Sequence, residues 1–122
     1  MRGGTVPVWL LVQVELQFNE NLKSIFPREY RADLLAEGTD VYYGVHFVSA
    51  PAKVNPGDRV VAELVFRAFP KDQCAAFQTG RKVFLKEGPL TRAEGILIRR
   101  WEHETPGTLT DLRQELAPGG FQ

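Results

Sequence analysis

Residues 8–18, VWLLVQVELQF, decide the fold because every second residue of this stretch is apolar. The even positions all carry apolar side chains, whereas Gln13, Glu15 and Gln17 lie between the later ones. Successive side chains of a β-strand point to opposite faces, so this alternation predicts a strand with one buried face and one solvent face. The dominant period of the chain is therefore two.

Further segments on the C-terminal side continue the strand pattern. They are residues 30–37, 42–48, 59–69, 82–87 and 92–101. Asn55-Pro56-Gly57-Asp58 predicts a tight turn, because proline presets one backbone dihedral and glycine supplies a positive one. Residues 86–91 predict a hairpin. In the last segment the core face is left open, since Ile96, Leu97 and Ile98 are consecutive.

The six segments together predict an all-β domain, either a closed antiparallel barrel or a sandwich. The alternation turns Val12, Val14, Leu64 and Phe66 toward the core. A length of 122 residues with 43% hydrophobic residues suits one domain with a substantial core.

Charge and cysteine content exclude several classes of protein. Fifteen Lys and Arg balance fifteen Asp and Glu, so the formal net charge is zero and no global field attracts nucleic acid or an acidic membrane. Cys74 is the single cysteine, which excludes an internal disulfide. Because the sequence shows neither an export signal nor an apolar run long enough to span a membrane, it predicts a cytoplasmic location.

Several motifs follow one another in a recognisable order. Val54–Val60 precedes a strand that ends at Phe69-Pro70, and Gly80–Gly88 and Thr91–Ile98 come next. Upstream, Tyr30-Arg31 opens the second strand. In this order and spacing the chain resembles the C-terminal, third β-barrel domain of elongation factor Tu.

The likeness extends over residues 8–101 and includes two small residues of the last strand, Ala93 and Gly95. It implies a six-stranded closed antiparallel barrel with Greek-key connections, which we place at residues 1–104. The remaining tail, residues 105–122, is the one part with a helical pattern. Thr108 is a candidate N-cap for a short helix. The apolar face of that helix would comprise Leu109, Leu112 and Leu116.

In elongation factor Tu this barrel docks a GTPase domain, exchange factors and tRNA. The present sequence contains no Gly-Lys-Ser/Thr phosphate loop, so we expect a barrel that stands alone without the GTPase. The family's tRNA-contact loop matches residues 19–27, which lack its glycine pair and arginine and offer Lys23 and Ser24 instead. The resemblance therefore implies a non-catalytic binding module, and we expect its partner to be another protein.

Residues that could carry catalysis or hold a metal are few. His46 lies inside a strand, and His103 stands between Glu102 and Glu104. Alternate residues share a strand face, so the two glutamates would point away from the histidine between them. A metal ion needs ligands that converge at about 2 Å. The sequence thus predicts no enzyme activity, no cofactor and no metal.

The cations of the final hairpin are candidates for a binding surface. Lys82, Lys86 and Arg92 can share an outer face, with Arg81 beside them. Such a patch would bind RNA if exposed aromatic rings lay among the cations, and RNA binding is the alternative function. A solvated barrel exterior accounts for the same cations. The candidate partner-binding residues are Lys23, Phe77, Arg81, Lys82, Lys86 and Arg92.

Aromatic residues at the rim favour a protein interface about as well as the cations favour RNA binding, and packing beneath the loops and the C-terminal helix accounts for at least half of these residues. These residues are Trp9, Phe26, Phe69 and Phe77. Residues 71–79 form an insertion relative to the family, and Phe77 is its one large apolar residue. Phe77 either pins the loop to the barrel or awaits a partner. We expect pinning, because an exposed phenylalanine is a liability. Cys74 of this loop is either a reactive thiol or a small buried hydrophobe.

Overall fold

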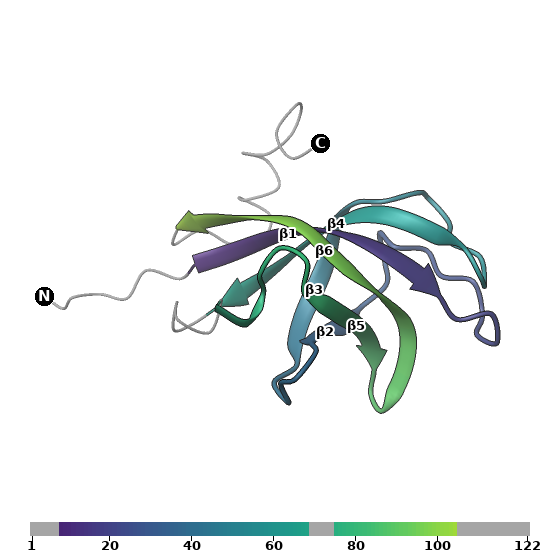
Figure 1. Ribbon diagram of the computed structural model, residues 1–122. Coiled ribbons are helices and arrows are strands. Elements are labelled where there is room, and N and C mark those ends of the chain that lie inside the picture. Colours follow the sequence, from purple (N-terminus) through teal and green to yellow (C-terminus); the bar gives the residue numbers. More distant parts are fainter. Residues whose placement is uncertain (1–7, 69–74, 105–122) are drawn as a thin grey trace, which may run out of the picture.

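The computed structural model describes residues 8–68 and 75–104, and Figure 1 shows strands that curve around one common interior. The strands are β1 (Val8–Phe18), β2 (Ala32–Ala36), β3 (Tyr43–Ser49), β4 (Arg59–Ala68), β5 (Lys82–Glu87) and β6 (Leu90–Glu104). All six predicted segments are thus strands, and β6 is longer than expected at both ends. The expected tail helix lies outside the described residues, as do Phe69 and Cys74.

The strands close into an antiparallel barrel in the order β1-β4-β3-β2-β5-β6. Strand β1 completes the closure, because it pairs with β4 along one edge and with β6 along the other. Strands β2, β3 and β4 are successive neighbours, and β1 lies beside β4, which is a Greek-key connection. The structure is therefore a barrel and not a sandwich, and closure leaves none of the six described strands with an open edge.

The inward faces of the strands form one hydrophobic core. The four residues predicted to face it are all buried, and Leu64 of β4 lies directly opposite Val12 of β1. Ala93 and Leu97 of β6 enter the same core. The alternation of apolar residues along β1 and β4 therefore predicted the core face correctly.

A β-bulge in β6 explains why the sequence left its core face open. Residues 13–14 of β1 pair with Arg99 and Leu97, so the register skips Ile98. Leu97 is fully buried, whereas Ile96 and Ile98 are exposed. A bulge inserts one residue and thereby reverses the phase of the alternation beyond it. The consecutive apolar residues thus serve two faces of the barrel wall.

Gly95 permits a close approach between β1 and β6. A Cβ atom at this position would lie 1.7 Å from the carbonyl oxygen of Glu15. Glycine at such a site allows two backbones to come together where any side chain would push them apart. The small residue that the sequence carries here is therefore a requirement of barrel closure.

Truncation of a core residue in β4 should destabilise the protein far more than truncation of an outward residue on the same strand. Leu64→Ala is expected to lower the free energy of unfolding by about 2–5 kcal/mol, because it leaves a cavity. Val61, which is 48% exposed, is the matched control. Val61→Ala should change that free energy by less than about 0.5 kcal/mol. Equilibrium denaturation measures both, and equal losses would contradict the register of β4.

Candidate interaction surface

Arg92 of β6 is the centre of a polar cluster that ties three parts of the barrel together. Its Nε donates to Glu87 Oε1 at 2.7 Å and to the Tyr30 hydroxyl at 3.0 Å. Tyr30 in turn donates its hydroxyl proton to Glu87 Oε1 at 3.0 Å. The Arg92 Nη1 also donates to the carbonyl oxygen of Lys23 at 3.2 Å. Arg92 therefore joins the end of β5 to the segment before β2 and to the loop after β1.

The ionisation of this cluster follows from its contacts. Burial and the hydrogen bond to Glu87 raise the pKa of Tyr30 to about 12. Hydrogen bonds from Arg92 and then from Tyr30 lower the pKa of Glu87. Burial alone would lower the pKa of Arg92, but its contacts with Glu87 and Tyr30 outweigh that effect and raise it. At neutral pH the positive charge of Arg92 therefore compensates the negative charge of Glu87, and the neutral Tyr30 hydroxyl is hydrogen-bonded to both.

The other predicted cations of the final hairpin also contact groups of the barrel itself. Lys86 Nζ donates to Thr91 Oγ1 at 2.8 Å. Lys82 Nζ lies 3.4 Å from Glu94 Oε1 and 5.4 Å from the centre of the Phe84 ring. Arg81 Nη1 donates to the carbonyl oxygen of Glu37 at 2.9 Å. The structure therefore brings these cations onto one side of the barrel, but it engages each of them in a local contact.

Lys23 and Phe77 complete the set predicted from the sequence. Lys23 is exposed in the loop between β1 and β2. Phe77 is 1% exposed, and its ring centre lies 4.9 Å from that of Phe66 and 5.5 Å from that of Tyr43. This packing supports the pinning role, and in this conformation Phe77 offers no surface to a partner.

Only some of the aromatic residues predicted to line the rim of the barrel are exposed. Trp9 is buried, Phe26 is 56% exposed, and Phe69 lies outside the described residues. The Lys53 ammonium lies 6.0 Å from the centre of the Phe26 ring. The rim is therefore not a continuous aromatic surface, because Trp9 and Phe77 face away from solvent.

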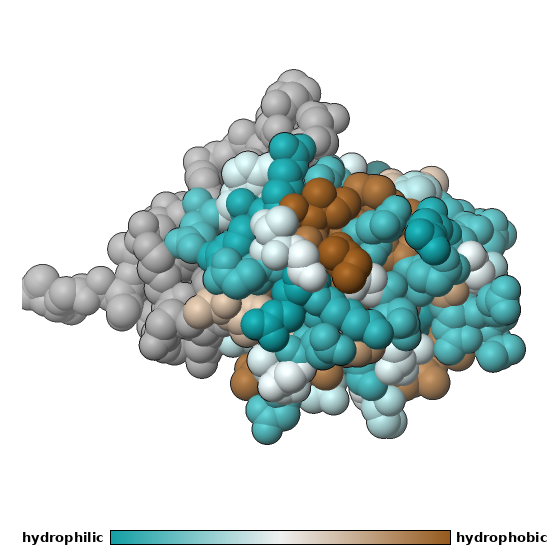
Figure 2. Space-filling view, in the orientation of Figure 1, coloured by the Kyte–Doolittle hydropathy of each residue, from teal (hydrophilic) through white to brown (hydrophobic). Residues whose placement is uncertain are grey.

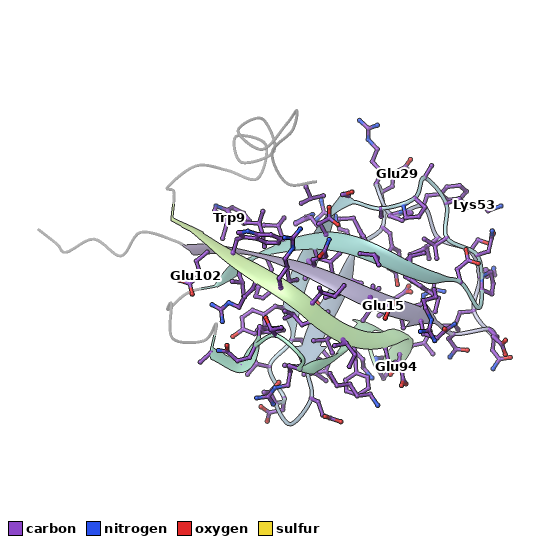
Figure 3. The ribbon with its side chains drawn as sticks, turned by 45° about the horizontal axis from the view of Figure 1, so that its top comes forward. Trp9, Glu15, Glu29, Lys53, Glu94 and Glu102 are labelled. Carbon is purple, nitrogen blue, oxygen red and sulfur yellow. The ribbon has the colours of Figure 1, made fainter. Side chains whose placement is uncertain are left out.

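An exposed apolar surface lies instead on the outer wall formed by β4, β1 and β6. We call Val61, Ile96, Ile98 and Trp101 the apolar face; their exposed fractions range from 37% to 48%. Glu15 of β1 pairs with Val61 on one side and with Ile96 on the other. Figure 2 shows hydrophobic residues gathered on this side of the molecule with polar residues around them, and Figure 3 places Glu15 midway along the barrel wall.

Polar groups border the apolar face. The Arg99 guanidinium stacks over Trp101 at 4.7 Å from the ring centre, and its Nε donates to Gln13 Oε1 at 3.2 Å. A groove of about 330 Å³ adjoins Ile96, with Glu15 and Lys82 among its lining residues. Apolar side chains inside a polar border are the usual anatomy of a protein-binding surface.

The sequence carries a signal for the apolar face that the alternation of apolar and polar residues does not reveal by itself. Apolar residues at consecutive positions of one strand cannot all point inward, so Val60-Val61 and the run 96–98 each place an apolar side chain outside. Val61 is neither charged nor aromatic and was therefore not among the residues predicted to bind a partner.

The described residues show no grouping suited to metal chemistry. Within residues 8–68 and 75–104, no three His, Cys, Asp or Glu side chains gather closely enough to hold an ion. The same part of the chain contains no helix long and apolar enough to cross a membrane.

The fold and its outer wall define the class of the protein as a six-stranded closed antiparallel β-barrel. Beyond that class, no model of a known protein family matches the chain, and no curated protein matches it.

Alkaline titration should reveal a late tyrosine step near pH 12 that belongs to Tyr30. Its folded pKa of about 12 lies above the ordinary value of 10.0, so the stability that the protonated hydroxyl contributes is complete below pH 10.0 and is lost as the pH rises through about 12. Tyrosinate absorbance measures the step. Tyr30→Phe should remove it, whereas Tyr42→Phe, a change at an exposed tyrosine, should leave it. A late step that survives in Tyr30→Phe would contradict the assignment.

Proposed function

We propose that this protein is a non-catalytic binding module that docks another protein on the apolar face of its barrel. The observation that carries the proposal is the exposure of four large apolar side chains on one stretch of wall. Exposed apolar side chains rimmed by polar residues often mark a protein interaction site. Among the other exposed large apolar residues described, Phe26, Val41 and Tyr42 lie in loops, and Leu90 is the first residue of β6, beside the hairpin turn.

The barrel wall is a suitable scaffold for such an interface. Val61 of β4 and Ile96 of β6 lie on strands that both pair with β1, so the closed sheet fixes their spacing before any partner arrives. A preformed surface does not have to be ordered on binding, which reduces the entropic cost of association. The groove beside Ile96 offers a recess for a side chain of the partner. Trp101, stacked under Arg99, provides the type of residue that often dominates binding energy.

The resemblance to the third domain of elongation factor Tu supports the same conclusion, because that barrel is a docking surface. The six-stranded closed antiparallel architecture agrees with it. On this proposal the module acts in the cytoplasm, without a cofactor, and retains the docking role of the barrel. The resemblance is an analogy of fold, so it supports a class of function and names no partner.

RNA binding by the final hairpin is the less favoured alternative. Phosphate recognition requires cations that can leave water for the nucleic acid and release its counterions. Lys82 and Lys86 already contact Glu94 and Thr91, and Arg92 is held by Glu87 and Tyr30. Binding of RNA would have to break these contacts. The described hairpin therefore supports a solvated exterior better than a phosphate groove.

Charge insertion into the apolar face should abolish capture of the partner. Ile96→Arg is the test, and Leu90→Arg is the matched control, because both residues are 44% exposed but Leu90 is the first residue of β6, next to the hairpin turn and outside the apolar face. Affinity capture from native lysate followed by mass spectrometry should recover a protein with the wild type and with Leu90→Arg, but not with Ile96→Arg. Denaturation midpoints of all three chains must agree, which excludes unfolding as the cause.

Two outcomes would overturn this proposal. Capture that survives Ile96→Arg would place the interface elsewhere. Tight binding of tRNA that falls steeply with salt and is lost in Lys82→Glu with Lys86→Glu would establish the RNA alternative, since counterion release produces that salt dependence.

A further inference from the structure

Glu15 places an acidic group within the apolar face. It lies on β1, and its neighbours across the sheet are Val61 of β4 and Ile96 of β6, which are 48% and 44% exposed. Val14 and Leu16 are fully buried, so the side chain of Glu15 between them points outward. Glu15 is half-buried. One row of the barrel wall therefore holds a carboxylate between two apolar side chains.

The arginines nearest to Glu15 in the sheet are bound to other acceptors. Arg59 of β4 and Arg99 of β6 are diagonal neighbours of Glu15, a position from which long side chains can reach across. Arg59 Nε instead donates to Gln17 Oε1 at 3.2 Å, and Arg99 Nε donates to Gln13 Oε1 at 3.2 Å. The two glutamines that flank Glu15 on β1 thus hold both arginines.

Two further charged residues beside Glu15 do not neutralise it. Lys82 lines the same groove, but its Nζ lies 3.4 Å from Glu94 Oε1 and forms an ion pair there. Glu63, a diagonal neighbour on β4, is acidic itself and only 4% exposed. Among the described residues, the Glu15 carboxylate takes part in no hydrogen bond or ion pair. It is therefore an accessible anionic group that this part of the chain leaves unpaired.

A protein that covers the apolar face has to satisfy this carboxylate. Contact with Val61 and Ile96 would remove water from Glu15, and a carboxylate that loses water needs a hydrogen-bonding cation. An arginine meets the requirement best, because its guanidinium is weakly hydrated and donates two parallel N–H groups to a carboxylate. Its aliphatic stem can also pack against apolar side chains.

We propose that the protein which docks on the apolar face presents an arginine side chain to Glu15. This inference rests on the docking proposed above and adds the chemistry of the partner. The partner's guanidinium donates to the Glu15 carboxylate, and its stem lies against Ile96 in the groove of about 330 Å³. Apolar side chains around that arginine cover Val61 and Ile96.

A second copy of this chain matches the face less well. A two-fold symmetric dimer centred on this row would bring two Glu15 carboxylates together, and like charges repel each other. The arginines that a second copy could offer from the same face are already bonded to Gln13 and Gln17. We therefore assign the arginine to a different protein.

Two peptides of the same shape test the charge requirement. The probes are acetyl-Leu-Ser-Arg-Ser-Leu-amide and the same peptide with citrulline, a neutral isostere, in place of arginine. An extended peptide carries its leucines and its central side chain on one face. In nuclear magnetic resonance titrations the arginine peptide should shift the amide signals of Glu15, Val61 and Ile96. It should bind about tenfold more tightly than the citrulline peptide, as expected for a charge-assisted hydrogen bond.

Glu15→Gln should abolish the preference for arginine, because it keeps the shape of the side chain and removes its charge. Glu29→Gln is the matched control. It removes the same charge from an exposed residue in the loop between β1 and β2, and the preference should persist. Equal binding of the two peptides to the wild type, or no shift at Glu15 with either, would overturn the proposal. A preference that survives Glu15→Gln would overturn it as well.

The partner recovered by affinity capture separates this inference from the docking proposal. Its affinity should fall about tenfold with Glu15→Gln and stay unchanged with Glu29→Gln. A partner that is lost with Ile96→Arg but bound equally by Glu15→Gln would overturn the arginine contact and leave the docking surface in place. Shifts at Val61 and Ile96 that grow with protein concentration, without any peptide, would also overturn the inference, since a second copy would then be the occupant.

Discussion

The pairing of β1 with two neighbours is the constraint on which the rest of the barrel depends. β1 forms long antiparallel ladders with β4 and β6, and these connect the meander β2-β3-β4 to the hairpin β5-β6. The two ladders require a tight fit, because the Glu15 carbonyl oxygen leaves no room for a side chain at residue 95. A barrel closed in this way fixes the spacing of side chains on both of its surfaces. The inward side chains form the core, and the outward side chains make the surface contacts.

Much of this fold could be predicted from the sequence because strand periodicity is a local signal. The alternation along residues 8–18 gives both the strand and its inward face, and the residues 86–91 hairpin follows from turn chemistry. Closure is not local, since it depends on which distant strands meet. The β6 bulge is likewise set by the fit of β6 against β1, so the run at 96–98 could not be divided into faces beforehand.

The candidate surface was harder to predict than the fold. A lysine or arginine on a strand looks available for binding in a sequence, but its availability depends on partners that are distant in the chain. Arg92 meets Tyr30, which is 62 positions away, and Arg81 meets Glu37, which is 44 positions away. Phe77 was also ambiguous in the sequence, because only the position of Phe66 and Tyr43 decides whether its ring is enclosed.

The outer wall of the barrel has a polar part at the β5-β6 hairpin and an apolar part on β4 and β6, and this difference bears on function. The hairpin cations are matched by acceptors within the barrel, so the binding capacity of that side is largely occupied by intramolecular contacts. The outward side chains of β4 change from fully buried at Val65 to half exposed at Val61, a boundary four residues long on one rigid strand. The apolar side chains on the exposed side of that boundary contribute favourable free energy only when another surface covers them and removes them from water. Because the sheet already holds Val61 and Ile96 at a fixed spacing, a partner of the proposed kind would have to match the barrel wall in shape, and this favours another folded surface over a flexible polyanion.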